Sequence, residues 1–412
     1  MTFKPIRIAI ASDLHIGDAA KGADLRLNNP HDAVVSNYLE PFRDFVQEKG
    51  IVADYLLIPG DITNKADPLE FQRASEVIVD IASFLNVDKR KIVFVPGNHD
   101  KNWGLISSCQ GLSSEAVQQI SYSPLMQESL LFKEQMDIGN GCFIQDPYCL
   151  VWSFEELIVF ALNSSLHDAP ETGIDPHHGK LTREMLAHLD EVAGSFKTDQ
   201  RMKVCLVHHH PYLYTEPTDE SKDFSAMHNS QELLEIVARN RIDAVVHGHK
   251  HVPSFLPMSN GFHPLLLLSS GSFSAELYEK WHGSTRNQFH LLELDQRCPT
   301  DLVVKGCLKS WSYFHPHGWR ESRELMEGIN HHLGFGCHLN TVQLKARIKP
   351  IIEGLLSAEG YFNLEQVAQS FENLKFAYMP TVMDALEELK EELGFVIRAE
   401  PKLLDVLILK RR

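Results

Sequence analysis

Five short stretches of this chain combine residue types that bind metal ions or transfer protons. The stretches are Ser12-Asp13-Leu14-His15, Pro59-Gly60-Asp61-Ile62-Thr63-Asn64, Pro96-Gly97-Asn98-His99-Asp100, His208-His209-His210-Pro211 and His247-Gly248-His249-Lys250-His251. Their donors are carboxylates, amides and imidazoles without thiolates, a set that suits Mn²⁺, Fe or Zn²⁺. They outnumber the roughly four to six ligands of one ion, so we expect two metal ions that share a carboxylate.

The spacing inside these stretches decides which side chains can converge. Residues two apart in an extended or gently turning backbone face the same way, so Asp13 and His15 can reach one ion. His249 and His251 have the same spacing, and Gly248 permits a turn before them. Of the three histidines at 208–210, at most two can face one site, and the spacing leaves open which.

Each stretch follows a short apolar run that is typical of a buried strand. The runs are residues 6–11, 55–58, 92–95, 204–207 and 242–246. Helical periodicity separates several of them, at residues 33–49, 70–85, 183–192 and 230–239. Alternating strands and helices predict a parallel sheet core, and the carboxyl ends of such strands are where α/β sheets bind ligands. We also expect Pro41 to kink or split its helix and Thr182 to be an N-cap.

The remaining segments are less regular. Residues 157–162 predict another strand, and residues 265–269, 287–293 and 302–308 predict antiparallel strands. Residues 101–150 sustain no period and are interpreted as an insertion, and His177 and His178 as loop histidines. The aromatic and His-rich residues 309–340 are interpreted as a loop-bearing connector with a domain boundary near 335.

The last part of the chain has a different pattern. Helices are predicted at residues 344–358, 363–371 and 380–393, followed by strands at 395–398 and 404–409, which is the element order of a winged helix. Residues 341–412 contain ten Lys and Arg against eleven Asp and Glu. Because nucleic-acid binding modules are usually basic, we favour a packing or dimerisation module, which binds a second copy or a protein partner.

Composition limits the class of protein. The chain has 412 residues, of which 43% are hydrophobic and 23% charged, so it can form a sizeable core. A formal net charge of −16 argues against strong non-specific nucleic-acid binding. The seven cysteines form no C-x-x-C pair, and no apolar run has the length of a signal-peptide core or a membrane span. We therefore expect a cytoplasmic protein that does not enter a membrane.

The five stretches together resemble the calcineurin-like metallophosphoesterase superfamily. The motifs are D-x-H, G-D-x-x-N, G-N-H-D, H-H-P and G-H-x-H, in this order, within about residues 6–310. The residues within these motifs are most similar to those of the cyclic-nucleotide-type phosphodiesterases. The resemblance implies a four-layer αββα sandwich for residues 1–335. Residues 336–412 lie outside the resemblance, and their element order predicts a winged-helix-like α+β module.

The resemblance also implies a site. Asp13, His15, Asp61 and His251 would hold the first metal, and Asp61 would bridge to a second one. Asn98, His209 and His249 would complete the second site, with His208 as the alternative to His209. Mn²⁺ is the preferred metal, with Fe or Zn²⁺ as alternatives.

Catalytic roles follow from the same resemblance. His99 would contact the phosphate or protonate the leaving oxygen, and Asp100 would orient its ring. Asn64 stands where many members have Asp, in a supporting position. Two metal ions about 3.5–4 Å apart would generate a bridging hydroxide as the nucleophile.

The expected function is hydrolysis of a phosphodiester, either a nucleotide or another small diester. The alternatives are a DNA nuclease of the double-strand-break repair type and a phosphoprotein or phosphomonoester phosphatase. A regulatory binding module is the alternative outside the enzymes. The fold of this superfamily constrains the chemistry more closely than the substrate.

Overall fold

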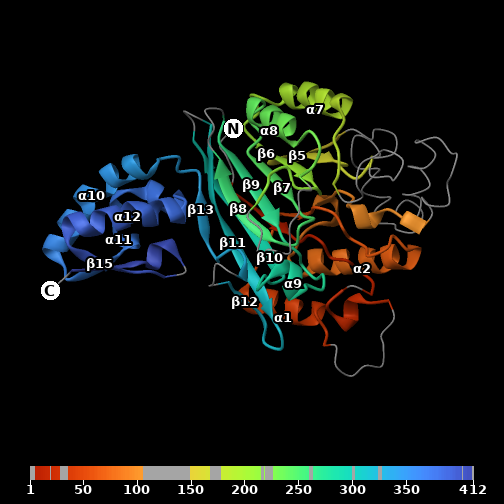
Figure 1. Cartoon of the computed structure of the whole chain (residues 1–412), viewed down its shortest axis with the longest axis horizontal. Coiled ribbons are helices and arrows are strands. Elements are labelled where there is room, and N and C mark those ends of the chain that lie inside the picture. The colour runs from red at the N-terminus through yellow and green to blue at the C-terminus, as the bar shows by residue number, and fades with distance from the viewer. Residues whose placement is uncertain are drawn as a thin grey trace.

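Two β-sheets pack face to face (Figure 1), and each of the five stretches lies where a strand of one of them ends. The computed structural model describes residues 5–18, 20–27, 36–104, 149–167, 178–214, 218, 226–258, 263–298, 302–322, 327–400 and 402–410. The predicted insertion at 101–150 therefore lies mostly outside the described residues, and His177 lies outside them as well.

The first sheet is seven-stranded and mixed. Its strands are β1 (Ile6–Ile10), β2 (Tyr55–Ile58), β3 (Ile92–Phe94), β10 (Gln288–Arg297), β11 (Val304–Phe314), β12 (Gly318–Glu321) and β13 (Leu333–Phe335). β1, β2 and β3 are parallel, as predicted, while β10 is antiparallel to β1 and β11 is antiparallel to β10. Because β1–β3 are parallel, the residues that follow them meet at one edge.

The second sheet has six strands in the order β4-β5-β6-β7-β9-β8. They are β4 (Leu150–Ser153), β5 (Leu157–Leu162), β6 (Met202–Val207), β7 (Ala244–His247), β8 (Pro253–Met258) and β9 (Leu265–Ser270). β5, β6, β7 and β9 are parallel to their neighbours in this run, and all their side chains are buried. Continuous apolar runs of this kind are what a sheet covered on both faces requires.

Helices cover the outer faces of the two sheets (Figure 1). α1 (Leu39–Lys49) and α2 (Pro68–Phe84) pack against each other beside the first sheet, and α7 (Arg183–Ser195) and α8 (Ser230–Arg239) do so beside the second. The short α9 (Glu279–His282) precedes β10. Thr182 caps α7 as predicted, since its Oγ1 accepts a hydrogen bond from the Met185 amide. The architecture is the predicted sandwich of two sheets between helices.

Three predictions about these elements were wrong. Pro41 neither kinks nor splits α1, because it is the third residue of the helix, where its missing amide proton has no partner to lose. Residues 309–340 are not mainly a connector, since they contain the end of β11 and strands β12 and β13. β9 is parallel to β7, and it is antiparallel only to the hairpin partner β8.

The last part of the chain forms helices and a small sheet with a hydrophobic core of their own. The elements are α10 (Thr341–Ala358), β14 (Tyr361–Asn363), α11 (Leu364–Ser370), α12 (Met379–Leu393), β15 (Phe395–Arg398) and β16 (Leu407–Lys410). β16 lies between β14 and β15, so the sheet has one strand more than predicted. The separate core supports the domain boundary near residue 335, which remains a prediction.

This C-terminal module contacts the first sheet at β13 and the second sheet at β8 (Figure 1). The Cys337 amide donates a hydrogen bond of 3.0 Å to the Phe376 carbonyl, and the Tyr378 hydroxyl donates one of 3.4 Å to the Phe255 carbonyl. Gly334 permits the close approach, because a Cβ there would lie 2.4 Å from the Lys375 carbonyl oxygen. Among the described residues, no helix combines the length and the apolar character that a membrane crossing needs.

A buried ion pair links the two sheets at the end opposite the five stretches. Arg297, the last residue of β10, donates two hydrogen bonds to the Asp243 carboxylate before β7, at 2.7 and 3.0 Å. Arg297 also donates to the backbone carbonyls of Gln200 and Arg201 before β6. The Asp243 carboxylate further contacts the ring of His263 at 3.0 Å. Burial alone would raise the pKa of Asp243, but the hydrogen bonds from His263 and Arg297 hold it below its ordinary value.

Asp243→Asn tests this link. The substitution leaves the buried Arg297 charge without its partner, so we expect a loss of about 3 to 5 kcal/mol in unfolding free energy, measured by urea denaturation. Because the pKa of Asp243 is lowered in the folded state, its stabilisation is present above about pH 4 and is lost as the pH falls through the folded-state value. The variant should therefore show a weaker acid dependence of stability than the natural chain.

Asp44→Asn is the matched control, because Asp44 pairs with Arg43 on the exposed surface of α1. We expect its unfolding midpoint to remain that of the natural chain. An Asp243→Asn variant as stable as this control would contradict the role of the ion pair.

Candidate metal centre

The candidate ligands lie on loops that begin where the buried strands end. Asp13 and His15 follow β1, Asp61 follows β2, and Asn98 opens a short 3-10 helix, Asn98–Asp100, just after β3. The loops after β1 and β2 are joined by backbone hydrogen bonds from Asp13 to Gly60 and from His15 to Asp61. The loops after β6 and β7 are joined by a bond from Gly248 to His208. Both sheets therefore deliver side chains to one place.

Left-handed backbone conformations aim these side chains. Asp13, His15, Asp61, His249 and His251 have φ angles of 51°, 49°, 48°, 77° and 56°. Such values cost a residue with a Cβ of order 1–3 kcal/mol, and they persist only where the surroundings hold them. The backbone at Asp13 and at His15 is therefore left-handed and not extended. Strain concentrated at five candidate ligands supports a functional role for them.

The first group of donors consists of Asp13, His15, Asp61 and His251. His15 Nε2 lies 3.1 Å from His251 Nε2 and 3.6 Å from Asp61 Oδ2. His251 Nε2 lies 3.3 Å from Asp13 Oδ1. These are the four residues that the sequence predicts for the first metal, and the structure brings them together.

The second group contains His208, His209 and His249. The Asn98 amide oxygen belongs beside it, at 3.0 Å from His208 Nε2 and 3.1 Å from His249 Nδ1. The two imidazole nitrogens are themselves 3.3 Å apart. Asp61 Oδ2 lies 3.3 Å from His208 Nε2, so one carboxylate oxygen reaches both groups. A shared carboxylate is the feature that two neighbouring metal ions require.

The donor atoms have the spacing that a metal ion imposes. Ligands about 2.1 Å from a central ion lie about 3.0 to 3.4 Å apart in octahedral or tetrahedral arrangements. Most of the distances within the two groups fall in or near this range. Oxygen and imidazole donors also suit hard and borderline divalent ions. The residues present therefore fit metal ions.

Protonation of the site is consistent with cation binding. Burial holds the pKa of His15 and of His249 well below the ordinary value, so both rings are neutral, as metal ligands must be. Burial opposes ionisation of Asp61, but His208 and His99 hold its pKa well below the usual range. Burial lowers the pKa of His208 and Asp61 outweighs that effect, raising it to about 9. The field that favours a proton at His208 also favours a divalent cation there.

Two glycines leave room for the carboxylates. A Cβ on Gly97 would lie 2.1 Å from Asp61 Oδ1, and one on Gly248 would lie 2.3 Å from Asp13 Oδ2. The G-N-H-D and G-H-x-H motifs need their glycines because each one faces a carboxylate from another loop.

His99 lies at the edge of the first group. Its ring packs edge-on to the ring of His15, with centroids 4.6 Å apart, and its amide donates to Asp61 Oδ1 at 2.8 Å. Its Nδ1 lies 2.9 Å from the Asn64 carbonyl oxygen. The backbone of Asn64 thus makes the supporting contact, which explains why an amide can stand where other members have an acid.

Asp100 has a different role from the predicted one. Its buried carboxylate accepts hydrogen bonds from the backbone amides of Ile62, Thr63 and Gly97. It therefore fixes the loop after β2 against the loop after β3, while the Asn64 carbonyl lies against the His99 ring. Burial and the nearby Asp61 charge raise the pKa of Asp100 to about 6.

Supporting residues escaped the sequence analysis. Ser164 Oγ lies 2.8 Å from His209 Nδ1, and the Pro59 carbonyl lies 2.8 Å from His208 Nδ1. The Pro59 contact places the proton of His208 on Nδ1 and turns Nε2 toward Asn98. Ser164 follows β5, the neighbour of β6, which is the one signal that could have identified it. Among the described residues, His178 belongs to neither donor group, and its ring lies 6.1 Å from that of His228.

Comparison with known structures gives weak likenesses. A dimetal phosphatase from Danio rerio is 14% identical, with a TM-score of 0.43, covering 74% of this chain and 96% of that one. A purple acid phosphatase from yellow lupin, Lupinus luteus, is 10% identical, with a TM-score of 0.46 and coverage of 75% and 52%. The NAD nucleotidase of Haemophilus influenzae is 12% identical, with a TM-score of 0.37 and coverage of 78% and 60%. A comparison with curated protein sequences gives no match.

The family model gives the decisive match. The model described as calcineurin-like phosphoesterase matches residues 6–253, which is more than half of the chain and includes all five stretches. Its members use divalent metal ions to hydrolyse phosphoric esters, and the two donor groups lie within the matched residues. This chain belongs to the calcineurin-like phosphoesterase family and is a hydrolase of phosphoric esters.

Proposed function

We propose that this chain is a phosphodiesterase that uses two metal ions to hydrolyse a nucleotide or another small diester. The observation that supports the proposal is the position of Asp61, whose Oδ2 lies 3.6 Å from His15 Nε2 in one donor group and 3.3 Å from His208 Nε2 in the other. A carboxylate placed this way can be shared by two ions.

The two donor groups define which residues would hold the ions. Asp13, His15, Asp61 and His251 would hold the first, and Asp61, Asn98, His249 and a histidine after β6 would hold the second. Two divalent ions supply an activated water and charge stabilisation of the phosphoryl oxygens. Mn²⁺ is the metal we propose, and Fe and Zn²⁺ also suit oxygen and imidazole donors.

His208 is our choice for the second ion. Its Nε2 lies within 3.3 Å of donor atoms from Asp61, Asn98 and His249. His209, which the sequence favours, has its Nδ1 against Ser164 and remains the alternative.

His99 is the residue that we propose for proton transfer. The Asn64 carbonyl oxygen accepts from Nδ1, so proton exchange would take place at Nε2. A proton on Nε2 would pass to the leaving alkoxide oxygen. Asp100 contributes by holding the His99 and Asp61 loops together.

The alternatives have less support. A nuclease should present a basic surface, but the surface of α12 carries Glu387, Glu388, Glu391 and Glu392. Lys345 and Lys349 of α10 form ion pairs with Glu388 and Glu392 of this surface, so the acidic residues partly neutralise their charge. A phosphomonoester phosphatase would use the same ligands and is separated by the assay below. A purely regulatory module would not need the strained ligand loops.

Asp61→Asn tests the proposed chemistry. We expect the natural chain with Mn²⁺ to hydrolyse bis-p-nitrophenyl phosphate faster than p-nitrophenyl phosphate, measured by p-nitrophenolate release. The variant loses the shared charge, so its kcat/KM on the diester should fall at least about 100-fold, more than for a supporting residue. Asp44→Asn is the matched control and should keep full activity, because Asp44 is an exposed residue of α1.

Two results would contradict the proposal. Equal activity of Asp61→Asn and the natural chain would remove Asp61 from the mechanism. Faster hydrolysis of the monoester would instead assign the chain to the phosphomonoester phosphatases.

The choice between His208 and His209 has its own test. We expect His208→Ala to bind one Mn²⁺ per chain and His209→Ala to bind two, measured by metal analysis after dialysis. The reason is that His208 Nε2 lies among the other donors, whereas Ser164 contacts His209 on the other side of its ring. Two ions in the His208 variant and one in the His209 variant would reverse the assignment.

A further inference from the structure

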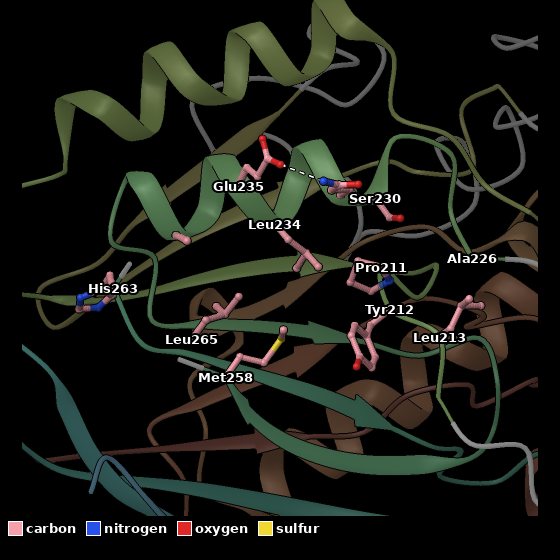
Figure 2. Close-up of a pocket in the computed structure, with 12 residues that line it drawn as sticks. Pro211, Tyr212, Leu213, Ala226, Ser230, Leu234, Glu235, Met258, His263 and Leu265 are labelled. Carbon is pink, nitrogen blue, oxygen red and sulfur yellow. Dashed lines mark hydrogen bonds between the residues drawn. The ribbon is translucent and has the colours of Figure 1, made fainter. Parts of the chain in front are cut away.

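A cavity of about 670 Å³ lies beside α8 and the hairpin of β8 and β9 (Figure 2). Leu234 points from α8 toward the strands that carry Met258 and Leu265, while Tyr212 lies at one end and His263 at the other. Gln231, Leu234, Glu235 and Ala238 line it from α8 and form a single stripe at helical spacing. The volume is that of an ordinary small-molecule site.

The lining is apolar. Among the described residues that line the cavity, Glu235 is the only carboxylate and none is Lys or Arg. Glu235 is exposed and accepts a hydrogen bond of 3.1 Å from Gln231 of its own helix. His263, at the far end, is held by Asp243. A phosphate group would find no cation here, so the cavity suits an apolar group.

Some residues that line the cavity directly follow candidate metal ligands in the sequence. Pro211, Tyr212 and Leu213 line it, and they directly follow the histidines at 208–210. Three peptide bonds separate His208 from Pro211, which limits the distance between their Cα atoms to about 11 Å. Leu213, which is 58% exposed, stands at this end. An ester whose phosphate lay at the metal centre could therefore place an attached chain in the cavity.

We propose that this cavity binds an apolar chain on one ester group of the substrate, which makes the preferred substrate a phosphodiester of a lipophilic alcohol. The inference rests on the proposed function, because it assigns the substrate class of the same centre. Hydrolysis breaks the phosphorus–oxygen bond to the leaving alcohol and forms one to the oxygen of water. One proton of the water passes to the leaving oxygen, and the other is released by the phosphate product. The cavity takes no part in this exchange and acts only in binding.

A chain-length series tests the proposal. The substrates are ethyl, butyl, hexyl and octyl p-nitrophenyl phosphate, used with the Mn²⁺-loaded full-length chain below the concentration at which they aggregate. We expect kcat/KM to rise about threefold to fourfold for each methylene that enters the cavity, and then to level off. A flat series with measurable hydrolysis of the ethyl ester would overturn the cavity proposal and leave the phosphodiesterase proposal intact.

Two substitutions in the lining should change the alkyl chain length at which kcat/KM levels off, in opposite directions. Ala238→Phe shortens the cavity, so kcat/KM should level off at a shorter chain while the ethyl ester is unaffected. Leu234→Ala enlarges it and should extend the rise to longer chains. Glu232→Phe introduces the same ring as the first variant at an exposed position of α8 outside the lining, and should match the natural chain.

A binding measurement separates failure of the cavity from failure of the catalytic proposal. The probe is 6-propionyl-2-dimethylaminonaphthalene, whose fluorescence reports an apolar environment, and the competitor is 1-octanol. We expect saturable binding that octanol displaces, weakened at least about fivefold by Ala238→Phe and unchanged by Glu232→Phe. If no ester is hydrolysed but this pattern appears, the catalytic proposal fails and the apolar site stands. Equal probe binding in all variants would overturn the site.

Discussion

One carboxylate constrains the rest of this structure. Asp61 has to be ionised, buried and within 3.6 Å of histidines from two different sheets. A buried charge is tolerated only when surrounding groups stabilise it, and here His208, His99 and the His99 amide do so. The parallel strands β1–β3, the parallel strands β6 and β7, and the face-to-face packing of the sheets are all needed to bring these groups together. The glycine at 97 then keeps the space beside the carboxylate empty.

The sequence predicts which candidate ligands lie close together because that information is local. Each ligand loop directly follows an apolar strand, and parallel pairing then brings the loops to a common edge. What the sequence does not contain is the conformation of the loops. The left-handed φ angles of Asp13 and His15 are imposed by hydrogen bonds to Gly60 and Asp61, which are distant along the chain. For the same reason the supporting contacts of Asn64 and Asp100 could not be assigned from the motifs.

The errors in the predicted fold also have physical causes. β8 contains Pro253 and Pro257, and prolines argue against a strand unless it lies at an edge, which the sequence does not reveal. Without β8, the direction of β9 could not be inferred, since β9 lies between β7 and β8. Pro41 was misread because the start of α1 was placed too early, and a proline in the first turn is harmless. Residues 309–340 were interpreted as a connector because they are rich in aromatic residues and histidine. Their strands pair with partners that are distant in sequence, so local composition does not indicate them.

The contact between the C-terminal module and β13 has a consequence for the solution behaviour of the chain. β13 is a three-residue strand with one side paired to β11, and on its other flank Cys337 forms a bridge with Ala377 of the module. Unpaired strand edges are templates for association between chains, and proteins limit this by keeping such strands short or covering them. The module therefore covers part of β13 and continues the chain's pairing just after it, at the Cys337–Ala377 bridge. The backbone from Lys375 to Ala377 makes these contacts, so a change in its conformation would expose β13 to pairing with another chain.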